Sequence, residues 1–388
     1  MVHAMTLIPE SSADGPTPGA YAGIESLAGV FHPHAVEVQD FSQYRAIIDL
    51  RSAAAFEDDH IPGALHADVR DWAMGAEGAR SNAPATPPLA VHEATTLELP
   101  PALLASVAAV GRDQALLVYC DQGGRVSSPV ARALRWHGWT VDVLPGGWIN
   151  YRRWVLAGLE VLPRLIPFRV IASALGSETV RIMTALRSLG QQVLDIESLA
   201  GVRRNALSGP MSMSMAAVPQ PAQAWFDSQL LQALRALDPR APVWVTDTGA
   251  SLGVVVLPGA LIDALAIAPV GQLQIDLAIR AAAWAEDEPL CANAEVLIKT
   301  VAGRDPQPAP TLVSRWHALA KRGGGAPLWA SVLSEHLEPL YQTQRAARAD
   351  RQHALPSLPV DSLSGAALAQ ALRLWLPTPA DDRSAAFT

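Results

Sequence analysis

The sequence predicts an α/β protein with parallel sheets, arranged as two successive units. Short apolar runs of strand length alternate with helical segments along most of the chain, a pattern typical of a parallel sheet covered by helices. The chain has 388 residues, of which 50% are hydrophobic and 17% are charged. This length suits two or three domains, and this composition supplies a sizeable core and excludes a disordered chain.

The first unit follows a leader, residues 1–25, that is rich in Ser, Pro, Gly and Ala. Apolar runs predict its strands, which are AIIDL (46–50), ALLVYC (115–120) and VDVL (141–144). Between the first two strands, residues 72–100 are expected to form a long loop. Helices are expected at 127–139, where Pro129 lies in a first turn that tolerates proline, and at 148–159.

The second unit begins after Pro163 and Pro167. Its predicted strands are FRVIAS (168–173), QVLDI (192–196), VWVTD (243–247) and GVVVL (253–257). A helix is expected from Glu178 to Leu189, before Gly190, and the Met-rich stretch at 207–221 is expected to be a mobile loop. From Pro310 onward the pattern is helical, with a last helix at 363–376 and a frayed tail at 377–388.

Charge and composition exclude several function classes. The net charge is −8, so the basic footprint of a nucleic-acid-binding protein is missing. The longest apolar stretch, 254–270, is interrupted by prolines, a glycine and an aspartate, and no membrane span is expected. Two cysteines, Cys120 and Cys291, cannot build a disulfide framework or a four-thiolate zinc site. With no secretory signal visible, we expect a cytoplasmic protein without a metal site.

Cys120 is the strongest candidate for chemistry. It ends a predicted buried strand and precedes the loop Asp121-Gln122-Gly123-Gly124-Arg125 and a helix. Backbone N–H groups and a helix N-terminus converge on such a position and favour a negatively charged sulfur or selenium. Cysteine phosphatases need five residues between Cys and Arg, whereas four separate Cys120 from Arg125, so the cradle suits a single chalcogen atom. The alternative is a buried, inert thiol.

This loop resembles the active loop of rhodanese-family sulfurtransferases. Similar stretches of that family are IIDLRSAAAF (47–56) with its Asp-x-Arg segment, HIPGALHAD (60–68) and LPGGW (144–148). The resemblance covers about residues 30–160, and we place the rhodanese domain at 26–162. It implies that Cys120 is the nucleophile of a ping-pong cycle and carries the transferred atom as a persulfide or perselenide.

The other polar residues of this region are assigned supporting roles. Arg125 is expected to hold an anionic donor, whereas Asp49 and Arg51 are expected to brace the loop rather than react. The acidic cluster at 57–59 is expected to be a solvated turn, and His60 a packed ring rather than a base.

The second unit resembles that of the tRNA 2-selenouridine synthases, which join a rhodanese domain to a P-loop-type domain. Similar segments are GQQVLDIESLAG (190–201), QPAQAWFDSQL (220–230), VWVTDTGASLG (243–253) and HLEPLY (336–341). We place the P-loop-like domain at 166–345 and a helical extension with a tail at 346–388. The family implies tRNA as partner and replacement of the 2-thio sulfur of its wobble uridine by selenium from selenophosphate.

The phosphate loop departs from the family pattern. The family's loop ends Gly-Lys-Thr, whereas residues 173–180 read SALGSETV, and neither Lys299 nor Lys321 follows a glycine. Without that lysine the β- and γ-phosphates lose a partner, and Glu178 adds repulsion. Nucleotide binding and a bound cofactor are therefore not expected. Only Arg203 remains of the family's His-Arg-Gly-Ser segment, as a candidate substrate-binding residue.

Three functional hypotheses follow. The first is a transferase similar to tRNA 2-selenouridine synthase, and the second is a rhodanese sulfurtransferase that uses a sulfane-sulfur donor and has a non-catalytic second domain. The third is a non-enzymatic module that binds tRNA or another partner. A G-x-S-x-G pattern at 249–253 is not favoured as a hydrolase elbow, because the residues after it predict a strand instead of the required helix.

Overall fold

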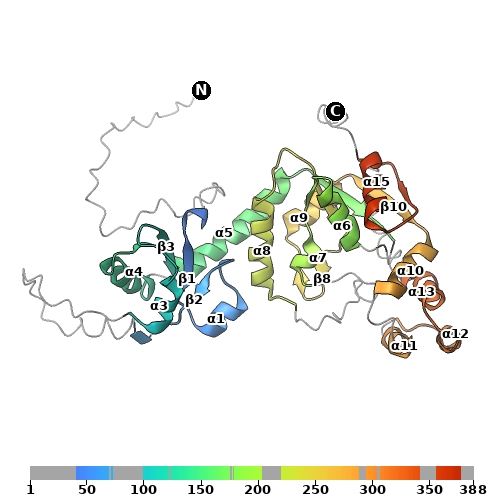
Figure 1. The fold of residues 1–388 in the computed structure, drawn as a ribbon, viewed down its shortest axis with the longest axis horizontal. Coiled ribbons are helices and arrows are strands. Elements are labelled where there is room, and N and C mark those ends of the chain that lie inside the picture. The colour runs from blue at the N-terminus through green and yellow to red at the C-terminus, as the bar shows by residue number, and fades with distance from the viewer. Residues whose placement is uncertain are drawn as a thin grey trace, which may run out of the picture. The chain divides into compact units, whose positions relative to one another are not determined.

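The computed structural model describes residues 41–69, 71–72, 99–121, 124–174, 177, 179–202, 220–287, 294–303, 306–340 and 355–376. The chain divides into two compact units (Figure 1). The first unit comprises Met1–Phe56 and Gly63–Trp154, and the second comprises Glu57–Pro62 and Val155–Thr388. Two of the unit boundaries fall inside helices, α1 (Ala53–Asp58) and α5 (Gly147–Val161).

The first unit contains a four-stranded parallel sheet in the order β2-β1-β3-β4. Its strands are β1 (Ala46–Asp49), β2 (Leu65–His66), β3 (Ala115–Tyr119) and β4 (Thr140–Val143). Four of the five residues of β3 are buried, which matches its continuous apolar run and its place between two neighbouring strands. In the register of β1 and β3, Asp49 lies opposite Tyr119, so the two strands end together.

Helices complete the first unit. They are η3 (Phe41–Gln43), α1 (Ala53–Asp58), α3 (Pro101–Val107), α4 (Ser127–Trp136) and the first half of α5. Helix α4 packs on β3 and β4 and buries Ser127, Val130, Ala131 and Leu134, the spacing of one helical face. This face and the sheet form one hydrophobic core with Leu103 of α3.

The second unit contains a five-stranded parallel sheet in the order β11-β10-β5-β7-β6. Its strands are β5 (Phe168–Ala172), β6 (Gln192–Val193), β7 (Val243–Thr246), β10 (Val270–Ile275) and β11 (Leu358–Val360). The first strand of the unit, β5, is central, with β6 and β7 on one side and the later strands on the other. Ligands of such sheets bind beyond the carboxyl end of the strand at which the order reverses, here after Ala172.

The helices of the second unit form two groups. Those beside the sheet are η4 (Leu162–Leu165), α6 (Thr179–Ser188), α7 (Ile196–Leu199), α8 (Gln223–Arg235), α9 (Gly259–Ile267) and α15 (Gly365–Trp375). A second core joins α10 (Leu277–Asp287), α11 (Ala294–Ala302), α12 (Pro310–Lys321), α13 (Ala326–Val332) and the π-helical turn η6 (Leu333–Leu337). The predicted α/β class with parallel sheets and a helical C-terminal part is thereby confirmed. Among the described residues, none of the helices has the length and apolar character needed to cross a membrane.

The strands predicted at 192–196 and 253–257 are shorter than expected. Strand β6 ends at Val193 because the Asp195 side chain accepts a hydrogen bond from the Ser198 backbone and starts α7. In the second stretch only β9 (Val255–Val256) is a strand, and it pairs antiparallel with β8 (Ser251–Leu252) around Gly253. Because no helix follows β8, this hairpin also lacks the strand-to-helix geometry of a hydrolase elbow.

Two further expectations are corrected. The extension predicted at 346–388 is not purely helical, because it contains β11, which pairs with β10 at the edge of the second sheet. Its helix α15 packs on α6. The acidic cluster at 57–59 is only partly solvated: Glu57 and Asp58 are exposed as expected but end α1 instead of forming a turn, and Asp59 is buried. The predicted leader and the tail lie outside the described residues, as do most of the Met-rich loop and most of the predicted 72–100 loop.

Candidate active site

Cys120 lies at the carboxyl end of the central strand of the first unit. It follows β3 directly, and its exposed fraction is 4%. The chain then turns at Gly124, which has a φ of 73°, and enters α4 at Ser127. A thiol at this place faces the N-terminus of a helix, which favours negative charge on sulfur.

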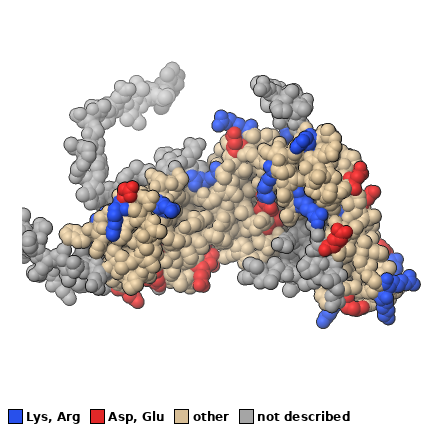
Figure 2. Space-filling view, in the orientation of Figure 1, with Lys and Arg blue, Asp and Glu red and all other residues tan. Residues whose placement is uncertain are grey.

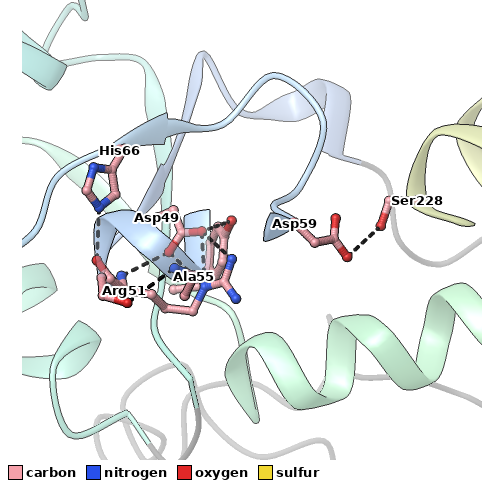
Figure 3. Close-up of polar contacts among 8 residues, drawn as sticks. Asp49, Arg51, Ala55, Asp59, His66 and Ser228 are labelled. Carbon is pink, nitrogen blue, oxygen red and sulfur yellow. Dashed lines mark hydrogen bonds and ion pairs between the residues drawn. The ribbon is translucent and has the colours of Figure 1, made fainter. Parts of the chain in front are cut away.

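A buried ion pair lies next to the end of β3. Asp49 and Arg51 are joined between Oδ2 and Nη2 at 2.7 Å, with exposed fractions of 0% and 3% (Figure 3). The Tyr119 hydroxyl donates to the same carboxylate at 2.6 Å. Burial lowers the pKa of Arg51, but hydrogen bonds and the charge of Asp49 outweigh burial and raise that pKa above its usual value. Arg51 therefore keeps its positive charge throughout the physiological pH range.

The ion pair connects to the cysteine through Trp148. The Arg51 guanidinium lies over the Trp148 ring, 3.8 Å from its centroid, in a cation–π contact. The Trp148 backbone N–H donates to the Cys120 carbonyl at 2.8 Å, and that of Ile149 donates to Asp121 at 3.3 Å. The start of α5 thus holds the residues where the cysteine loop begins.

Gly147 makes this close approach possible. Its φ is 59°, and a Cβ atom at this position would lie 2.3 Å from the Cys120 carbonyl oxygen. No side chain fits there without moving the loop. The second glycine of the LPGGW segment, Gly147, is therefore required by the close approach of the loop.

The Cys120 sulfur also contacts a hydroxyl. The Ser127 Oγ lies 3.3 Å from the Sγ of Cys120, and Ser127 is 1% exposed. Sequence analysis did not single out Ser127, Tyr119 or Trp148. Trp148 was visible in the LPGGW segment and Tyr119 at the strand end, but only the fold shows that they touch the loop and the ion pair.

The remaining predicted loop residues differ in exposure. Asp121 and Arg125 are exposed, whereas Gly124 is half-buried. Gln122, Gly123 and Arg203 lie outside the described residues. The structure therefore brings Cys120 together with Asp49 and Arg51 through Trp148, and it leaves the charged side chains of the loop at the surface.

Asp59 and His60 contact residues of the second unit, to which the contacts assign Glu57–Pro62. Asp59 accepts a hydrogen bond from Ser228 at 3.4 Å (Figure 3). The His60 ring packs against Trp225 with centroids 4.3 Å apart. His60 is thus a packed ring, as the sequence indicates.

A buried acid lies at the carboxyl edge of the second sheet. Glu197 of α7 is 4% exposed and accepts hydrogen bonds from Thr246 at 2.7 Å and from Thr179 at 3.3 Å. Thr246 ends β7, and Thr179 begins α6 directly after the β5–α6 connection. The two lysines, Lys299 and Lys321, lie on α11 and α12.

The glutamines of the QPAQ segment hold the β8–β9 hairpin. Gln220 donates to the Leu252 carbonyl at 3.0 Å and accepts from the Val254 N–H at 3.1 Å. Gln223 bonds the N–H and the carbonyl of Val256 in the same way, at 2.7 and 3.0 Å. Each side-chain amide thus takes the place of a neighbouring strand in pairing with the hairpin backbone. The QPAQ segment therefore has a structural role in holding the hairpin.

The HLEPLY segment also has framework contacts. Glu338 pairs with Arg280 of α10, and Arg280 donates from Nε to the carbonyl at the end of β10. His336 is buried, and its ring lies edge-on to Trp316 with centroids 6.0 Å apart. Among the described residues, no group of three or more His, Cys, Asp or Glu has the arrangement of a metal site.

Comparison with known proteins shows which families parts of this sequence resemble. Residues 35–153 match the rhodanese-like domain. A tRNA 2-selenouridine synthase of Hydrogenovibrio crunogenus is 30% identical over 119 residues, which are 30% of this chain and 31% of that protein. A tRNA 2-selenouridine synthase of Nitrosomonas eutropha is 29% identical over 150 residues, 38% of this chain and 37% of that protein. The chain thus spans about a third of the length of the curated relatives that it matches.

Proposed function

Because residues 35–153 form a rhodanese-like domain, we propose that Cys120 is the nucleophile of a chalcogen transferase. The observation that carries this proposal is the position of Cys120 at the end of the central strand, with its carbonyl held by Trp148 and its sulfur facing α4. The thiol is buried but adjoins a loop whose charged residues are exposed.

The proposed cycle has two balanced half-reactions with a sulfane-sulfur donor such as thiosulfate. The Cys120 thiolate attacks the outer sulfur, the donor S–S bond breaks, and sulfite leaves with the electron pair. A nucleophilic acceptor such as cyanide then attacks the carried sulfur. The bond to Cys120 Sγ breaks, and Cys120 departs as a thiolate. Arg125, exposed at the loop, is proposed to bind the anionic donor, while Asp49 and Arg51 hold the loop in place.

The acceptor that we propose is tRNA. Support comes from the two tRNA 2-selenouridine synthases that share part of this sequence. The proposed reaction replaces the 2-thio sulfur of a wobble uridine by selenium from selenophosphate. In this exchange the P–Se bond of selenophosphate and the C–S bond of the uridine break, water takes up the phosphoryl group, and phosphate and hydrosulfide leave. Selenium stays at the level of selenide throughout, so the exchange needs no oxidant. Cys120 is proposed to act in it as a thiolate nucleophile and not to carry a perselenide, which lies two electrons higher. No nucleotide takes part in this proposal, because Glu197 occupies the edge at which phosphates would bind.

Nucleoside mass spectrometry tests the proposal. Full-length protein is incubated with 2-thiouridine tRNA, selenophosphate and a geranyl donor, which members of the family also use. The variant is Cys120→Ala, and the matched control is Cys291→Ala, which removes the other thiol of the chain. We expect selenouridine from the wild type and from the control, and none from Cys120→Ala.

Two other results select the remaining hypotheses. If the nucleoside is unchanged while the wild type still converts thiosulfate and cyanide to thiocyanate, the protein is a sulfurtransferase with a non-catalytic second unit. The missing phosphate-loop lysine favours this second candidate. If neither reaction occurs, the transferase proposal is wrong, and a tRNA gel-shift then tests a binding module.

A further inference from the structure

Ser127 contacts the sulfur that is proposed to react. Its Oγ lies 3.3 Å from Cys120 Sγ, and the two residues are 1% and 4% exposed. Ser127 is the first residue of α4, and the N-cap position before it is taken by Val126. In the described part of the chain, the hydrogen-bond partner of this hydroxyl is the cysteine sulfur. The loop between the two residues turns the chain so that Ser127, seven positions after Cys120, lies next to the thiol.

We propose that Ser127 is the hydrogen-bond donor that stabilises Cys120 as a leaving thiolate in the second half-reaction. This inference rests on the proposed function. While Cys120 carries an outer sulfur, Sγ is bonded on both sides and accepts a hydrogen bond only weakly. When the acceptor attacks the outer sulfur, the Sγ–S bond breaks and its electron pair moves to Sγ. The Ser127 O–H then donates to an anion in a buried place, where such bonds are strongest.

The effect is specific to one step. A hydrogen bond that strengthens as charge develops lowers the barrier of that step, because the transition state gains more than the ground state. Loading of Cys120 depends less on Ser127, because a hydrogen bond to the attacking thiolate raises its population but reduces its nucleophilicity. Transfer from the persulfide should therefore slow more than loading when the hydroxyl is removed.

Single-turnover measurements separate the two steps. Cys120 is loaded with thiosulfate, the added sulfur is confirmed by protein mass, excess donor is removed, and thiocyanate is followed after cyanide is added. For Ser127→Ala we expect normal loading and a transfer that is about ten- to hundredfold slower, as for loss of a hydrogen bond to a charged group. Ser127→Thr, which keeps the hydroxyl, should restore most of the rate. Ser106→Ala is the matched control, since Ser106 lies on α3 of the same unit and its hydroxyl donates to the Ala102 carbonyl.

A second readout keeps the test independent of the transfer reaction. The rate of Cys120 alkylation by iodoacetamide is measured against pH, and we expect its midpoint to move to higher pH in Ser127→Ala. Wild-type transfer by a folded Ser127→Ala protein would overturn the proposal. If the wild type loads no sulfur, the proposed function fails, and alkylation decides alone: an unchanged midpoint overturns the role of Ser127, and a raised one supports it. Melting temperatures show that each variant is folded.

Discussion

At the scale of single residues, the cysteine loop depends on a charged pair that water cannot reach. Asp49 receives hydrogen bonds from the backbone and side chain of Arg51 and from Tyr119. Arg51 in turn places its guanidinium against Trp148. A buried ion pair with complete hydrogen bonding contributes mainly to a defined arrangement, and it becomes costly when one partner is removed.

Asp49→Asn should therefore destabilise the first unit and misplace the loop. Asparagine keeps the shape but leaves the buried Arg51 charge uncompensated, which we expect to cost about 3 kcal/mol. Urea unfolding measures the loss, and persulfide loading should fall with it. Glu160→Gln, which breaks the exposed pair with Arg164, should not change unfolding measurably. Equal effects of the two substitutions would contradict the role of Asp49.

Gly147 allows a second test of the loop. Gly147→Ala should reduce persulfide loading sharply, because its Cβ would lie 2.3 Å from the Cys120 carbonyl oxygen. Gly138→Ala is the matched control, since Gly138 also has a positive φ but open space around its Cβ position. That control should lose about 1 kcal/mol of stability through backbone strain and keep its loading rate. Normal loading by Gly147→Ala would show that the loop tolerates displacement.

His336 should make the second unit sensitive to acid. Burial lowers the pKa of His336 below the usual 6.5. The folded state therefore favours the neutral ring, and the unfolded state takes up a proton first as the pH falls. The resulting stability is present above about pH 6.5 and is lost as the pH falls through the lower folded value. Urea midpoints between pH 7 and about 5 should decrease less in His336→Phe than in the wild type; parallel curves would refute this.

At the scale of elements, the second sheet has the strand order of a ligand-binding edge, and a buried acid lies at that edge. The reversal of strand order at β5 places the start of α6 at the position where anions commonly bind. Glu197 brings a negative charge to this edge and is held there by Thr179 and Thr246. We therefore expect the carboxylate of Glu197 to disfavour phosphate at this edge.

ATP or GTP with Mg²⁺ should accordingly leave the melting temperature unchanged. A ligand that binds the folded state at a hundred times its Kd adds about 2.7 kcal/mol of stability, which would raise the melting temperature by several degrees. Thermal denaturation at millimolar nucleotide detects such an effect. A clear upward shift would mean that the β5–α6 edge binds phosphates without a lysine.

At the scale of the whole molecule, each unit has its own hydrophobic core. Ile48, Leu116 and Val118 belong to the core of the first unit, while Ile171 and Trp284 belong to two cores of the second. On the face shown in Figure 2, acidic and basic groups are interspersed. The net charge of −8 likewise gives no broad basic surface. If the protein binds tRNA, the phosphates would have to contact small groups of basic residues.

Separate cores predict separate unfolding. Calorimetry should show two transitions, and Ile48→Ala should lower only one of them, because it removes a fully buried side chain at a cost of about 2–5 kcal/mol. Leu104→Ala, which truncates a side chain that is 44% exposed in the same unit, is the control and should have a small effect. One shared transition that moves as a whole would mean that the two units unfold cooperatively.

The sequence alone was sufficient for the α/β class, for the strands at 46–50, 115–120 and 141–144, and for the position of Cys120. These features depend on local patterns, namely apolar runs of strand length and glycines at turns. It did not predict β10 and β11, because these strands are defined by partners far along the chain: β10 pairs with β5 and with β11. The burial of Asp59 and Glu197 and the contacts of Ser127 and Trp148 with Cys120 were decided by tertiary structure. Burial and hydrogen bonding are properties of neighbours in space, which a linear pattern does not record.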